Sequence, residues 1–189
     1  YSGNTLWNGI SLGHNISWSK NLKIGSRNDA DAYEDTRFNS KADWDLIRYG
    51  LFAVINKNNW QFRTNIKGQY SNEPLIAGEQ FGLGGTSNVR GYNEREIGSD
   101  IGQFVSFEAY APAWKSINFL VFYDYGHGRN QDPPLGENNQ WNIASIGLGM
   151  RWQWQGKLQT SVDWGHTLRE GVTTADNHQH IHASIALSF

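Results

Sequence analysis

The sequence predicts an all-β membrane protein built from the antiparallel strands of a transmembrane β-barrel, eight of them over residues 1–189. Three observations predict this. Apolar and polar residues alternate through segments of about 10 residues, the length and period of a strand that crosses a bilayer. Short and long connections alternate along the chain, and aromatic residues gather near the segment ends, where amphipathic rings favour the lipid–water boundary. Residues 1–189 are therefore expected to form a single barrel domain or half of a barrel.

The alternating segments define the expected strands. The last segment is the clearest, because Ile181 and Ile185 share one face while His182 and Ser184 share the other. The first segment is the weakest. In chain order, the eight expected strands cover residues 6–22, 46–55, 60–70, 101–111, 117–126, 141–155, 158–169 and 181–189.

The connections point to an outer-membrane barrel. Tight turns are expected at residues 56–59, 114–116 and 155–157, and long polar loops at 25–42, 72–100, 127–140 and 170–179. Loops of that length are unusual in a compact soluble domain, whereas outer-membrane barrels combine short periplasmic turns with long extracellular loops. A soluble sandwich or lipocalin-like barrel would alternate too. Its solvent face should carry many charges, but the polar face here is mostly Gln, Asn, Ser and Gly.

Composition narrows the class of protein. The chain has 21 Gly, 9 Trp and only 4 Pro, which suits strands and turns better than helices. The net charge of −2 and the lack of a basic stripe argue against a nucleic-acid partner. Without cysteine there is no disulfide framework, and no apolar run approaches the roughly 18 residues of a membrane helix. The chain begins at Tyr1 rather than Met, so we expect a processed protein or a fragment.

The loop over residues 72–100 carries the most informative motif, Leu83-Gly84-Gly85-Thr86-Ser87-Asn88-Val89-Arg90-Gly91-Tyr92. An arginine held away from water needs a carboxylate, because an unpaired buried guanidinium is costly. Asp124 and Glu108 offer one, since both fall on the polar faces of adjacent expected strands. Glycines beside the arginine would permit tight backbone turns. From the residues alone, a solvated loop arginine and an ordinary lumenal aspartate remain the alternative.

These residues resemble a known family. The run over residues 75–85, followed by Val89-Arg90-Gly91-Tyr92, is similar to the sixth-loop region of two-partner secretion transporters, the TpsB proteins of FhaC and ShlB type within the BamA-like superfamily. The family's F-x-D-x-G signature matches Phe122, Asp124 and Gly126. The terminal Phe189 resembles the C-terminal aromatic residue that the barrel-assembly machinery recognises.

The resemblance implies a 16-stranded barrel that follows two POTRA domains and a plug helix. The eight strands would be its last eight, so the POTRA domains, the plug and the first eight strands are expected to be missing here. The sixth loop would fold into the lumen, where its arginine binds the wall aspartate. The site residues expected on this basis are Arg90, Asp124 and Glu108 for the contact, Gly84, Gly85, Val89, Gly91 and Tyr92 for the loop, Phe122 and Gly126 for the wall, and Phe189 for assembly.

The resemblance also implies a function, namely a pore that exports a large partner exoprotein of the haemolysin, adhesin or toxin class. It places the protein in the outer membrane of a Gram-negative bacterium. Membrane lipid, lipopolysaccharide and the barrel-assembly machinery would be further partners, and no cofactor is expected. A stand-alone or engineered eight-stranded barrel without secretion activity is the alternative. A half-barrel would instead pair with another chain or self-associate.

A barrel enzyme is the remaining alternative. The alternate histidines His178, His180 and His182 could share a strand face and hold a metal, but we interpret them as a polar loop that runs into a strand. Asp163 and His166 suggest a hydrolase, yet their parity places them on opposite faces of the strand. The sequence therefore predicts neither a catalytic site nor a metal site.

Overall fold

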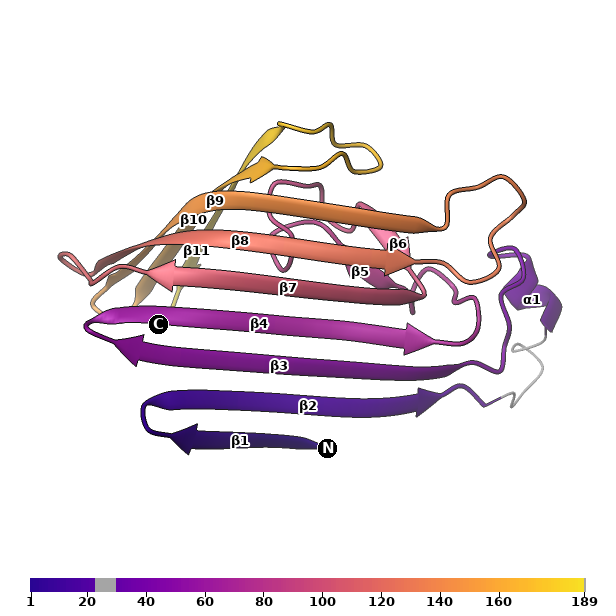
Figure 1. The fold of residues 1–189 in the computed structure, drawn as a ribbon, viewed down its shortest axis with the longest axis horizontal. Coiled ribbons are helices and arrows are strands. Elements are labelled where there is room, and N and C mark those ends of the chain that lie inside the picture. Colours follow the sequence, from indigo (N-terminus) through magenta and orange to yellow (C-terminus); the bar gives the residue numbers. More distant parts are fainter. Residues whose placement is uncertain (23–29, 189) are drawn as a thin grey trace.

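The computed structural model describes residues 1–22 and 30–188, and it is dominated by one antiparallel sheet (Figure 1). The sheet holds nine strands in the order β1-β2-β3-β4-β7-β8-β9-β10-β11. These strands are β1 (Ser2–Trp7), β2 (Ile10–Lys20), β3 (Asp45–Lys57), β4 (Trp60–Ser71), β7 (Ile101–Tyr110), β8 (Ile117–Arg129), β9 (Gln140–Trp154), β10 (Leu158–Thr167) and β11 (Gln179–Leu187). The connecting segments add a short hairpin, β5 (Phe81–Leu83) with β6 (Ile97–Ser99), and a one-turn helix, α1 (Ala30–Glu34).

The sheet curves like part of a cylinder wall and is open, with β1 and β11 as its two edges in the described structure (Figure 1). The tight turns lie at one end of the strands and the long loops at the other, as the alternation of connections predicted. Among the described residues, no helix is long and apolar enough to cross a membrane.

The described sheet has nine strands rather than the expected eight. The expected first strand, over residues 6–22, is divided into β1 and β2 by a tight turn at Asn8 and Gly9, whose φ angles are 45° and 80°. An Asn-Gly pair between two extended segments is a strong signal for a two-residue hairpin, because both turn residues need positive φ. The signal was present in the sequence and was missed.

The two faces of the sheet differ in chemistry, as the period-two pattern predicted. Large apolar side chains stand exposed on the convex face, which is what a lipid-facing surface requires. They include Ile47, Ile55, Phe62, Phe107, Phe119, Val121, Ile146, Leu148, Trp152, Ile181 and Ile185. The concave face carries polar residues instead, such as the buried Ser106, Asp124, Ser145 and Asp163.

The loop over residues 72–100 folds into the concave side of the sheet. Its β5–β6 hairpin packs against β7 and β8, and it appears behind these strands in Figure 1. An apolar cluster holds it there, formed by Leu83, Val89, Tyr92 and Ile97 from the loop with Phe104 and Ile143 from the wall. The cluster fixes the loop over the middle of β8, where the wall motif lies.

Candidate functional site

The structure brings Arg90 and Asp124 together in a buried bidentate pair. Arg90 Nε donates to Asp124 Oδ2 at 2.7 Å, and Nη2 donates to Oδ1 at 2.9 Å. The Arg90 backbone N–H also donates to Asp124 Oδ2, at 3.2 Å. The side chains of Arg90 and Asp124 are only 5% and 0% exposed. Two parallel hydrogen bonds between a planar guanidinium and a carboxylate fix the geometry of the pair as well as its charge.

Further wall residues complete the Arg90 site, which we define as Arg90, Asp124, Glu108, Ser106 and Asp163. Arg90 Nη1 lies 2.8 Å from Glu108 Oε1 and 3.8 Å from Asp163 Oδ1. Ser106 accepts from Arg90 Nη2 at 3.2 Å and donates to Asp124 Oδ1 at 2.6 Å. Burial acts to lower the pKa of Arg90, but the hydrogen bond and charge of Asp124, with the charges of Glu108 and Asp163, raise that pKa overall. The guanidinium therefore stays charged.

Phe122 supports the guanidinium from the wall. The Arg90 Cζ atom lies 3.5 Å from the centre of the Phe122 ring, so the cation sits on an aromatic face. The ring occupies the space above Gly147 on β9, where an added Cβ would lie 2.2 Å from Phe122 Cζ. Gly126 likewise leaves room for the loop, because a Cβ added at this position would lie 3.0 Å from the side chains of Leu83 and Val89. Both residues of the wall motif thus contact the loop.

The loop motif places its backbone tightly around Arg90. Gly84, Gly85 and Gly91 have φ angles of 100°, 102° and 97°, which residues with a side chain rarely adopt. Asn88 holds the tip of the loop together, because its Oδ1 accepts from the backbone of Gly84 at 2.7 Å. Sequence reasoning missed Asn88, although an Asn between a Gly-Gly pair and the arginine suits such a turn.

Gly165 on β10 lets the loop backbone lie against the wall, and sequence reasoning also missed this residue. A Cβ on Gly165 would lie 2.8 Å from the Gly91 nitrogen and 3.0 Å from the Arg90 carbonyl carbon. These are backbone atoms, so the loop itself would have to move. We expect Gly165→Ala to cost about 1–3 kcal/mol of stability and to expose residues 75–100 to protease. Gly78→Ala is the matched control, because nothing lies within 4 Å of its Cβ. Equal protease resistance in the two variants would contradict this contact.

Tyr92, the last residue of the loop motif, is fully buried. Its hydroxyl lies 2.9 Å from the Ala144 carbonyl oxygen and 2.7 Å from that of Arg169, and it accepts from the Ala144 N–H at 3.2 Å. Burial raises the pKa of the Tyr92 phenol, so the hydroxyl remains a donor at neutral pH. Tyr92 thereby fastens the loop to β9 and to the segment that follows β10.

Glu96 joins the 72–100 loop to the loop between β10 and β11. Its carboxylate accepts from the backbone N–H groups of Thr173 and Thr174, both at 2.8 Å, and from the Thr174 hydroxyl at 2.5 Å. The Asn93 N–H adds a bond of 3.1 Å. Burial acts to raise the pKa of Glu96. The hydrogen bonds lower that pKa by a larger amount, so it lies below the ordinary value of 4.5. The two loops are therefore held together by an ionised carboxylate.

This contact should be pH-dependent. Because the folded-state pKa of Glu96 is depressed, its stabilisation is complete above the ordinary value of 4.5 and is lost as the pH falls through the folded pKa. We expect the distribution of distances between spin labels attached at Ser87→Cys and Asp176→Cys to broaden in that acid range. Glu96→Gln should show a broad distribution at every pH, while the exposed Glu137→Gln should behave like the parent. A sharp, pH-independent distance in the parent would contradict the assignment.

A second buried ion pair lies at the long-loop end and was not predicted. Asp100, between β6 and β7, is 0% exposed, and Arg37 donates to both of its carboxylate oxygens, at 2.5 and 2.9 Å. Asp100 also accepts from the backbone N–H groups of Leu75 at 2.9 Å and Gln131 at 2.8 Å. Three connecting segments, those between β2 and β3, between β4 and β7 and between β8 and β9, therefore meet at one carboxylate.

The residues considered for catalysis are not assembled into a site. Asp163 is held by Arg151 through two bonds of 2.8 Å, while His166 stacks with Trp164 at 6.3 Å between ring centres. His180 and His182 stack at 4.5 Å near the start of β11. Within residues 1–22 and 30–188, no group of three or more His, Cys, Asp or Glu side chains is arranged to hold a metal. The predicted assembly residue Phe189 lies outside the described residues.

Fold and site together define a wall segment of an outer-membrane-type β-barrel with a loop bound inside it. Residues 1–152 match the family model of the haemolysin secretion/activation proteins ShlB/FhaC/HecB. The chain belongs to this family, and the resemblance of the two motifs is confirmed at that level.

Individual relatives agree with this assignment. The chain is 25% identical over 167 residues to the outer membrane transporter CdiB of Dickeya dadantii (strain 3937), covering 84% of this chain and 29% of that protein. Its fold matches CdiB from Acinetobacter baumannii with a TM-score of 0.70 at 20% identity, over 100% of this chain and 32% of the other. CdiB from Escherichia coli gives a TM-score of 0.70 at 18% identity, over 98% and 35%. The chain spans about a third of the length of these relatives.

Proposed function

We propose that this chain forms part of the wall of an outer-membrane pore that exports a large partner exoprotein in two-partner secretion. The observation that carries the proposal is the Arg90–Asp124 pair, which holds a long loop inside a polar concave face while the opposite face is apolar. Membership of the haemolysin secretion/activation family and similarity to an outer membrane transporter support the transport role and the location.

The open edges of the sheet support a larger barrel. β1 and β11 have strand partners on one side only in the described structure, and an unpaired strand edge in lipid leaves backbone N–H and C=O groups without hydrogen bonds. We infer that residues 1–189 form one part of a β-barrel wall and that further strands complete the barrel. The 72–100 loop is then the equivalent of the family's sixth loop. A stand-alone closure is less favoured, because the described sheet does not pair β1 with β11. Pairing of two copies through these edges remains the second way to complete the wall.

The same family membership supports a transport role rather than an enzymatic one, and Asp163, the carboxylate considered for a hydrolase, is paired with Arg151. Membrane lipid, lipopolysaccharide and the barrel-assembly machinery are proposed partners that follow from an outer-membrane location.

Secretion can be measured directly. The complete gene is expressed with its candidate exoprotein in a Gram-negative host, and the exoprotein is quantified at the cell surface and in the medium. We expect export to require the gene and the protein to fractionate with the outer membrane. Equal export in the absence of the gene would refute the proposed function.

A further inference from the structure

Three tight turns at the short-turn end of the sheet each carry a lysine next to a tryptophan, and all six side chains are exposed. The pairs are Lys57 with Trp60 across the β3–β4 turn, Lys115 with Trp114 in the β7–β8 turn, and Lys157 with Trp154 in the β9–β10 turn. The Lys115 Nζ atom lies 5.1 Å from the centre of the Trp114 ring. The backbone N–H of Lys157 donates to the Trp154 carbonyl oxygen at 3.0 Å. The same combination of side chains is therefore repeated along this end of the wall.

The tryptophans stand on the lipid-facing side of the wall. Trp60 and Trp154 alternate in step with Phe62 and Trp152, which are apolar residues of the convex face. The Trp60 and Phe62 rings stack with 6.4 Å between their centres. Because tryptophan favours the boundary between hydrocarbon and headgroups, these turns lie at the level of the headgroups. A lysine beside such a tryptophan keeps its ammonium in the polar layer while its methylene chain covers apolar surface.

The charge of these turns is one-sided. No Asp or Glu occurs in the turns or in the strand ends beside them, over residues 5–12, 55–62, 109–119, 150–160 and 183–188. The carboxylates of Glu108 and Asp163 face the lumen instead, where arginines pair with them. In the described structure, the lysines that pair with a carboxylate are Lys20 and Lys41 at the long-loop end, and none of the three turn lysines does so. Three cations therefore remain available on the outer side of the wall.

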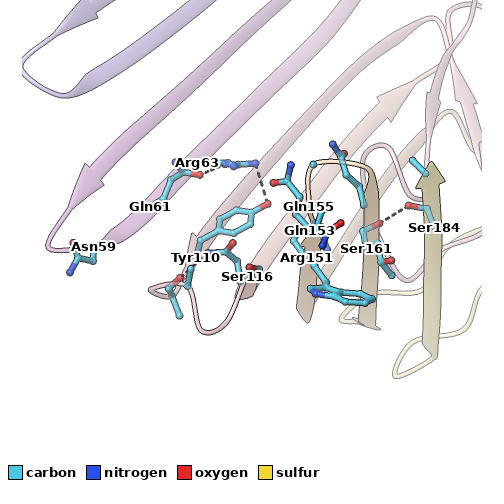
Figure 2. Close-up of a pocket in the computed structure, with 18 of the residues that line it drawn as sticks. Asn59, Gln61, Arg63, Tyr110, Ser116, Arg151, Gln153, Gln155, Ser161 and Ser184 are labelled. Carbon is cyan, nitrogen blue, oxygen red and sulfur yellow. Dashed lines mark hydrogen bonds between the residues drawn. The ribbon is translucent and has the colours of Figure 1, made fainter. Parts of the chain in front are cut away.

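Lys115 occupies a backbone position that does not favour lysine. Figure 2 shows Asn59, Ser116 and Gln155 in the same three turns, and each of them has a positive φ angle. Lys115 also has a positive φ, of 47°. Asn and Gly adopt this conformation more readily than lysine does. The geometry of the turn therefore does not explain the lysine, which indicates a contribution from its charged side chain.

We propose that these three turns bind the headgroups of anionic phospholipids in the leaflet at the short-turn end, which is the periplasmic leaflet for an outer-membrane barrel. Each tryptophan lies at the base of a headgroup, and each lysine donates to its phosphate. A zwitterionic headgroup carries its own ammonium, which repels the lysine, so a headgroup with net negative charge is favoured by about fivefold for each lysine. The inference goes beyond export and depends only on the outer-membrane location.

Lipid selectivity tests the proposal. The protein produced from its complete gene is purified in neutral detergent and given equal amounts of phosphatidylglycerol and phosphatidylcholine with the same acyl chains. Native mass spectrometry then gives the ratio of the two bound lipids, and we expect the parent to prefer phosphatidylglycerol. The turn variant combines Lys57→Gln, Lys115→Asn and Lys157→Gln, and its ratio should be about fivefold lower. It should remain folded, because Asn suits the positive φ at residue 115.

The matched control combines Lys20→Gln, Lys41→Gln and Lys67→Gln, which remove the same charge from lysines outside the three turns. Lys20 and Lys41 lie at the long-loop end, and Lys67 faces the lumen. The lipid ratio of this control should equal that of the parent. An equal fall in the control would assign the preference to net charge and overturn the proposal, as would an unchanged ratio in the turn variant. A parent without a preference would also overturn it and would leave the turn lysines to an acidic protein partner.

Discussion

Arg90→Ala is expected to detach the 72–100 loop from the wall and to abolish export. The substitution leaves Asp124, which is 0% exposed, without its cationic partner, and breaking a buried ion pair in this way costs about 3–5 kcal/mol. The loop also loses its bonds to Glu108 and Ser106. Single-channel conductance in planar bilayers should change, and residues 75–100 should become sensitive to added protease.

Two further variants make the Arg90 experiment specific. Arg90→Lys keeps the charge but loses the two-pronged contact with Asp124, so it should also be impaired. Arg95→Ala is the matched control, because Arg95 is an exposed arginine of the same loop whose side chain, within the described structure, donates only to the carbonyl oxygens of Ala77 and Gln80. Unchanged conductance and unchanged protease sensitivity in Arg90→Ala would show that the loop does not depend on the pair.

Asp100→Ala should have the second-largest effect, at the long-loop end of the sheet. The substitution removes the carboxylate that accepts hydrogen bonds from Arg37, Leu75 and Gln131. It leaves Arg37, whose side chain is only 20% exposed, without its anionic partner. We expect the free energy of unfolding to fall by about 3–5 kcal/mol, measured by thermal unfolding in detergent. Added protease should selectively cleave the long loops. The Arg90 site should remain intact, because the two carboxylates share no partner in the described structure.

Asp100→Asn refines this result. An amide donates where Leu75 and Gln131 also donate, so it should recover little of the loss. The control is Asp45→Asn, which alters a pair with Lys20 whose side chains are 44% and 45% exposed and should cost no more than about 1 kcal/mol. Equal losses in Asp45→Asn and Asp100→Asn would contradict the buried hub.

Much of the fold could be predicted because strands that face lipid on one side and a polar lumen on the other impose a strict period of two. That period placed Asp124 and Glu108 on the lumen face, and the structure puts both beside Arg90. It could not find β1, because only the Asn8–Gly9 turn separates β1 from β2 and the combined segment alternates poorly.

The contacts between loops were beyond sequence reasoning. Arg37 and Asp100 are separated by 63 residues and lie in segments without a period, so nothing local indicates that they meet. Glu96 belongs to the local charged run Glu94-Arg95-Glu96, which gives no sign of its partners, yet it binds threonines 77 and 78 residues away. Gly165 looked like any strand glycine, because its function depends on a loop that arrives from elsewhere in the chain.

A double-mutant cycle on Arg90 and Asp124 tests the central claim most directly, namely that the loop is held inside the lumen by this ion pair. Stability is measured for Arg90→Ala, Asp124→Ala and the double variant in the complete protein. We expect the double variant to be hardly less stable than either single variant, because each single change already destroys the pair and leaves its partner buried and uncompensated. Losses that simply add would show that the two side chains do not interact, and would contradict the account.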